Sequence, residues 1–143
     1  MPERISGEMP KSQEELAAEF KKMDDDHVAH GAITRELFLS GPEGEAEVNQ
    51  RVGTIEIEAV RNDAKFNLAK LYYEAKHDAK DALNKALEIT DLNEQTRCLV
   101  HLALSVLKNE GNQSLADELV ALAKKDDEGY LKYYKLEKEK ASE

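Results

Sequence analysis

A ten-residue stretch from Cys98 to Leu107 limits the folds available to this chain more than any other segment. It reads Cys-Leu-Val-His-Leu-Ala-Leu-Ser-Val-Leu, so a helix wound from it is apolar on nearly every face, and only His101 and Ser105 interrupt it. Such a helix belongs inside a protein, because none of its faces gains from contact with water. It is also far too short to span a bilayer, which takes about 20 residues. We therefore predict a central helix that neighbouring elements cover on several sides.

The remaining sequence favours helices as well. Ala, Leu, Glu and Lys dominate, and these are strong helix formers. The single run of strand-like alternation is Thr54 to Glu58. A chain of 143 residues is long enough for one domain with a sizeable core. We predict an all-α fold, an antiparallel helical bundle or short helical-repeat array of five to seven helices. It should form a single helical domain over residues 11–140 after a flexible arm at 1–10.

The charge of the chain bears on its partners and location. The net charge is −10, and residues 1–63 hold fifteen acids against seven bases. An acidic surface repels phosphate groups, so we expect no nucleic-acid partner and no membrane partner. The lone cysteine, Cys98, cannot form an internal disulfide. The first seven residues lack the pattern of a secretory signal, and together these features favour a cytoplasmic location.

A long seam of regularly spaced residues follows the Gly-Pro break at 41–42. Its spacing alternates between four and three residues, through Val48, Val52, Ile55, Ala59, Asn62, Phe66, Ala69 and Tyr73. This heptad pattern predicts one helix from Glu45 to Lys76 or, alternatively, two helices that break at 61–63. A heptad seam can pair with a second copy, and a polar Asn within it fixes the register. Val48, Val52, Ile55 and Asn62 are therefore candidate contacts of a homodimer.

Two segments of the second half can be aligned with each other. Leu68-Ala69 with Tyr72 recurs as Leu102-Ala103 with Val106, an offset of 34 residues. A second set recurs at an offset of 37 residues, with Ala79, Leu83 and Ala86 matching Ala116, Val120 and Ala123.

These matches resemble the tetratricopeptide repeat, a helix-turn-helix unit of about 34 residues, over residues 64–123. The chain departs from that pattern in lacking the early aromatic of the first helix and the repeat-ending Pro, and its first turn is short. The resemblance implies a groove that binds a peptide or a protein, and it does not imply catalysis.

Three tyrosines gather near the end of the chain, Tyr130, Tyr133 and Tyr134. Tyrosine is favoured at protein interfaces because its body is apolar and its tip is polar. The cluster is therefore a candidate interaction site, or else it covers the end of the core.

The chain offers few groups for metal binding or catalysis. Glu74 and His77 have the Glu-x-x-His spacing of di-iron helical bundles, but such a site needs a second Glu-x-x-His motif, which the sequence lacks. His101 lies three residues after Cys98, and a Cys–His pair on one helix face is the minimum for thiol chemistry. The sequence offers no obvious third residue to complete such a site. Glu74, His77 and His101 thus remain weak metal candidates. We expect no catalytic residue and no cofactor, and we expect His101 to be a hydrogen-bonded structural residue.

The sequence therefore favours a non-catalytic protein–protein interaction or adaptor module, with a homodimer as one candidate assembly. The first alternative is a small metal-binding helical-bundle protein or enzyme with His and Glu ligands. The second is an acidic chaperone-like binder of a basic partner, for which the negative first 63 residues would provide the docking face.

Overall fold

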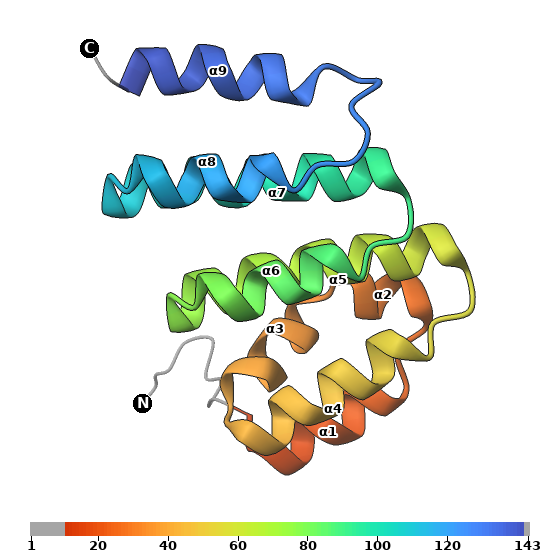
Figure 1. Cartoon of the computed structure of the whole chain (residues 1–143). Coiled ribbons are helices and arrows are strands. Elements are labelled where there is room, and N and C mark those ends of the chain that lie inside the picture. Colours follow the sequence, from red (N-terminus) through yellow and green to blue (C-terminus); the bar gives the residue numbers. More distant parts are fainter. Residues whose placement is uncertain (1–10, 142–143) are drawn as a thin grey trace.

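The computed structural model describes residues 11–141, and this part of the chain is all-α (Figure 1). It contains nine helices and no strand within the described range, so the predicted fold class is confirmed. The number of helices exceeds the predicted five to seven because the first half of the chain divides into short helices. The arm predicted at residues 1–10 lies outside the described residues.

The first half is built from four helices: α1 (Gln13–Lys21), α2 (Asp25–His30), α3 (Ala32–Leu39) and α4 (Pro42–Gly53). Ser12 caps α1 through a capping box with Glu15, as its spacing predicts. Gly31 separates α2 from α3 with an extended backbone (φ −81°, ψ 145°). A Cβ at this position would lie 2.3 Å from the carbonyl oxygen of His27, so the turn requires glycine.

The predicted continuous helix from Glu45 to Lys76 is wrong. The chain turns between the end of α4 and the start of α5 (Glu58–Lys76), and the alternative break at 61–63 is wrong too, because these residues lie inside α5. Ile55, in the turn, is buried at 1% exposure and anchors it. The guanidinium of Arg61 also donates to the carbonyl oxygen of Ile55 at 2.8 Å. The heptad spacing therefore arises from two helices that share one core.

Two helical hairpins follow one another with the same dimensions. Helix α5 pairs with α6 (Ala79–Leu87), and α7 (Leu92–Glu110) pairs with α8 (Gln113–Ala121). The first helices have 19 residues each and the second helices nine. Glu58 and Leu92 begin the first helices 34 positions apart, and Ala79 and Gln113 begin the second helices at the same interval. The offset of 37 inferred for the second helices is therefore wrong, and 34 applies to both.

The turns inside the two hairpins are also alike. His77 and Gly111 end the first helices in left-handed conformations, with φ of 52° and 63°. Asp78 and Asn112 then cap the second helices through their side chains. An αL residue followed by a side-chain cap is a compact way to reverse a helix, because both helix ends are hydrogen-bonded.

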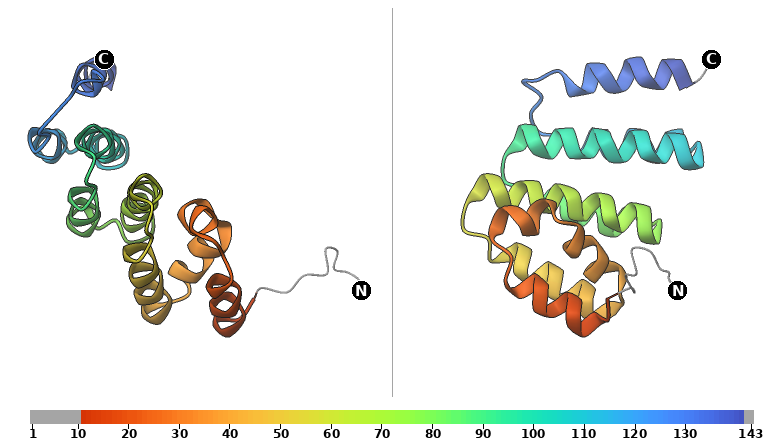
Figure 2. Two further views of the ribbon diagram at one scale, coloured as in Figure 1. Left: turned by 90° about the vertical axis from the view of Figure 1, so that its right-hand side faces the viewer. Right: turned by 180° about the vertical axis from the view of Figure 1, so that it is seen from behind.

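Helix α9 (Tyr130–Ala141) packs on α7, and the hairpins and α9 form successive layers (Figure 2). On the other side of the stack, α2 packs on α5. The predicted central helix lies within α7, with Cys98, Leu99, Ala103 and Val106 fully buried. Contacts from α5, α6, α8 and α9 cover it, which is why this segment is apolar on nearly every face.

Candidate binding pocket between α2, α3 and α5

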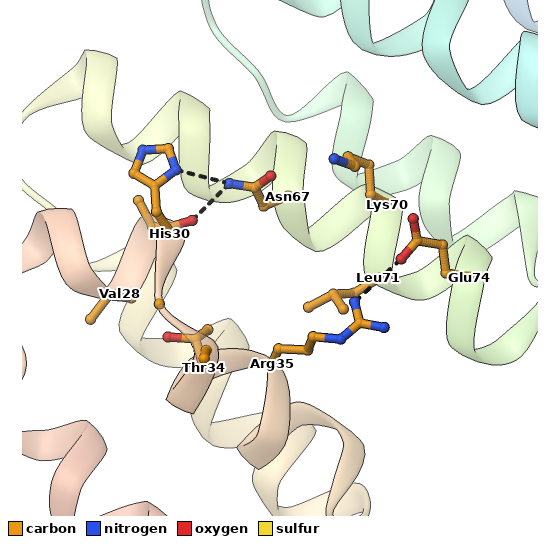
Figure 3. A pocket seen from close by; sticks show the side chains of 11 residues that line it. Val28, His30, Thr34, Arg35, Asn67, Lys70, Leu71 and Glu74 are labelled. Atoms are coloured by element: carbon orange, nitrogen blue, oxygen red, sulfur yellow. Dashed lines mark hydrogen bonds and ion pairs between the residues drawn. The ribbon is translucent and has the colours of Figure 1, made fainter.

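An open pocket of about 460 Å³ lies where α2 and α3 meet α5 (Figure 3). Pockets of this size suit small molecules or single side chains of a partner. Its lining combines an apolar floor with polar and charged walls, and consists of Val28, Ala29, His30, Gly31, Ala32, Thr34, Arg35, Asn67, Lys70, Leu71 and Glu74.

One end of the pocket is fixed by Asn67 of α5. Its amide nitrogen donates to the carbonyl oxygen of Ala29 at 2.7 Å and lies 3.3 Å from Nδ1 of His30. Figure 3 shows both contacts at the same end of the pocket. A partly buried amide that bonds to a backbone carbonyl of another helix holds the two helices at a defined distance. Asn67 thus fastens α2 to α5, and the Gly31 turn leaves the opening between them free of a side chain.

Charged side chains of both signs form the other end. Arg35 of α3 and Glu74 of α5 form an ion pair at 3.3 Å, and both are about half exposed. Lys70, one helical turn before Glu74, has no hydrogen bond or ion pair with any residue in the range 11–141. The pocket wall thus presents two cations and one carboxylate, in a chain whose net charge is −10.

The same face of α5 continues toward α7. The ring of Phe66, one turn before Lys70, lies 5.7 Å from the ring of His101. The guanidinium of Arg97 lies over Phe66, with its carbon 4.6 Å from the ring centre, which is a cation–π arrangement. We call Phe66, Lys70 and Glu74, with His101 and Arg97 beside them, the α5 stripe. Together with the pocket it joins side chains from four helices on one surface.

The surroundings of His101 lower its pKa. Burial lowers the pKa of this imidazole, the positive charges of Lys70 and Arg97 lower it further, and Glu74 opposes them. The hydrogen bond expected for His101 is not found among residues 11–141; its ring packs on Phe66 instead. Ser105 does not bond to it.

The neighbouring thiol is not a usable nucleophile. Cys98 is fully buried, and burial raises its pKa to about 12. Because the thiolate is the reactive form, the pair of Cys98 and His101 does not provide thiol chemistry at neutral pH.

The weak metal candidates do not form a ligand set. Glu74 faces Arg35, and His77 caps the end of α5 with its ring 6.1 Å from that of Tyr73. His101 lies on α7 against Phe66. Within the described range, no three His, Cys, Asp or Glu side chains converge on one point.

The seam residues lie in the chain's own core. Val48, Val52, Ile55 and Asn62 are between 0% and 4% exposed, so a second copy cannot contact them in this fold. The amide oxygen of Asn62 accepts hydrogen bonds from the backbone nitrogen of Thr90 at 3.1 Å and from its hydroxyl at 3.2 Å. Its polar side chain therefore fixes the loop after α6.

The three tyrosines differ in burial, so the cluster is partly core and partly exposed surface. Tyr134 is 3% exposed and donates to Asp117 of α8 at 2.7 Å, so it belongs to the core. Tyr133 is 51% exposed and stays available for a partner, and Tyr130 is partly buried.

Comparison with protein-family models, with curated proteins and with solved structures gave no match. None of the helices in the described range has the length and apolar character needed to cross a membrane.

The sequence pointed to Glu74 and His101 but not to four other polar residues of this surface, namely Arg35, Asn67, Lys70 and Arg97. One signal was present for α5: Asn67, Lys70 and Glu74 recur at intervals of three and four residues and therefore share a helix face. Nothing in the sequence shows that α2 and α3 lie against this face.

Proposed function

We propose that this protein is a non-catalytic protein-binding module and that its partner lies across the α5 stripe and the adjoining pocket. The observation that carries this proposal is that α5 forms the open pocket with α2 and α3 and also contacts His101 and Arg97 of α7 through Phe66. Arg97 and Arg35 are about half exposed there, and Arg is enriched at protein interfaces.

The repeated hairpins support this type of function. Helical hairpins that stack with a constant period expose the same face of each first helix along the array, and such faces form extended binding surfaces. In this chain α5 and α7 are the first helices, and both contribute to the stripe. The resemblance to the tetratricopeptide repeat is part of the proposal, with its 34-residue period as support. No family model matches the chain.

Selection of peptides from a random display library against the full chain tests the proposal. The tightest peptide is then measured against the double variant Lys70→Glu/Arg97→Glu and against the control Lys80→Glu/Lys132→Glu. Both variants change the net charge equally, and Lys80 and Lys132 are exposed residues of α6 and α9. We expect the stripe variant to bind at least about tenfold more weakly, which corresponds to the loss of one charge-assisted contact. The control should keep the wild-type affinity.

Circular dichroism of all variants separates lost binding from lost folding. The proposal fails if no peptide is enriched or if the folded stripe variant binds as tightly as the control. Light scattering of the same samples determines whether the chain forms a homodimer, in which case the partner surface is to be sought on a second copy.

A further inference from the structure

The pocket between α2, α3 and α5 carries charged side chains of both signs at its walls. Arg35 and Glu74 touch through a single contact of 3.3 Å, so further guanidinium donors and the second carboxylate oxygen have no partner among residues 11–141. Lys70 has no ion-pair partner within the described residues. Asn67 uses its amide nitrogen for α2, so its oxygen remains an acceptor. A ligand with one negative and one positive group would complete this set.

The floor of the pocket sets a further requirement for the ligand. Leu71, Val28 and Ala29 line it, and each is less than a tenth exposed, so they form a firm apolar base. A dianion such as a phosphate would face the carboxylate of Glu74, and a simple cation would face both Arg35 and Lys70. The charges and the floor together select a compact zwitterion with an apolar side chain.

We propose that this pocket binds a free α-amino acid with an aliphatic side chain. Lys70 and Arg35 hold its carboxylate, and the second carboxylate oxygen of Glu74 accepts from its ammonium group. Its side chain lies on Leu71 and Val28. At about 460 Å³ the pocket has room for such a ligand and several waters. This site shares Lys70 and Glu74 with the surface of the proposed protein partner, but its ligand is a different one, and its test does not require that partner.

Titration of the full ¹⁵N-labelled chain with L-leucine, followed by amide NMR shifts, tests this site. L-leucinamide and N-acetyl-L-leucine serve as matched ligands that lack the carboxylate charge and the ammonium charge, respectively. We expect leucine to shift amides of α2, α3 and α5, and each analogue to bind about tenfold more weakly. Both charges are needed in this mode, so both analogues must lose affinity.

Two variants assign the contacts. Lys70→Gln should reduce the preference for leucine over leucinamide, and Glu74→Gln should reduce the preference for leucine over N-acetyl-leucine. Lys80→Gln and Glu118→Gln are the controls, because both residues are exposed and lie outside the pocket. Their preferences should equal those of the wild type.

Three results would overturn the proposal. The first is the absence of shifts in the pocket amides at about 10 mM leucine, a concentration that detects even millimolar binding. The second is equal binding of leucine and N-acetyl-leucine, which would indicate a plain carboxylate site. The third is an unchanged preference in both folded pocket variants. A failed peptide selection, in contrast, would remove the proposed function and leave this titration unaffected.

Discussion

Thr34 on α3 provides a sharp test of the packing beside the pocket. Its side chain is 7% exposed, and its hydroxyl oxygen is buried without a hydrogen-bond partner among residues 11–141. A hydroxyl removed from water without a new partner costs about 1–3 kcal/mol in proteins. Valine has the same branched shape without this hydroxyl. Thr34→Val should therefore raise the free energy of unfolding by about 1–2 kcal/mol, although most substitutions at buried sites destabilise.

Urea unfolding followed by circular dichroism measures this change, with Thr34→Ser as the matched control. Serine keeps the unpaired hydroxyl and loses a buried methyl group, so this variant should be less stable than the wild type by about 1 kcal/mol. If Thr34→Val is destabilised instead, the hydroxyl has a partner in solution, such as an ordered water. The reasoning about this wall of the pocket would then be wrong.

Three further measurements test other parts of the structure. Burial raises the pKa of Cys98 to about 12, so this thiol should react with a thiol reagent only as fast as the chain unfolds. Labelling at the rate of a free cysteine would contradict its place in the core. Tyr134→Phe removes the hydrogen bond to Asp117 and should cost about 1 kcal/mol at neutral pH in urea unfolding. That bond and Lys138 hold the pKa of Asp117 below its usual value, so this stabilisation is present above about pH 4 and is lost as the pH falls further. The difference in unfolding free energy between wild type and variant should therefore become smaller in acid. A difference that does not change with pH would refute the link between this bond and the ionisation of Asp117. Asn62→Ala leaves the backbone nitrogen of Thr90 unpaired and should cost about 1–3 kcal/mol by the same assay, whereas a change within experimental error would show that the loop finds another acceptor.

Much of the helical architecture could be predicted from the sequence. The stretch Cys98–Leu107 is apolar on nearly every face because four helices cover it, so its composition reflects its environment directly. The capping box at Ser12 and Glu15 and the Gly111 stop are local signals, and the structure shows both. Local chemistry decides such features, and they need no knowledge of the tertiary fold.

The heptad seam shows where this reasoning fails. Val48, Val52 and Ile55 keep coiled-coil spacing with Asn62, yet the chain turns between Gly53 and Glu58. A buried turn residue satisfies the same spacing as a helical one when both face the core. The seam therefore predicts correctly which residues are buried, but it predicts wrongly that they belong to one continuous helix.

The α5 wall of the pocket could not be predicted for a different reason. On a helix, a row of polar residues such as Asn67, Lys70 and Glu74 has the composition of an ordinary solvated face. What distinguishes it is the pairing of Glu74 with Arg35 and of Asn67 with the backbone of α2, contacts between residues 38 or 39 positions apart. Such long-range contacts leave no periodic trace. The decisive feature of this surface is thus that α2 contacts Asn67 and α3 contacts Glu74. Lys70 lies between these two contacts at the edge of the pocket and has no ion pair within the described residues.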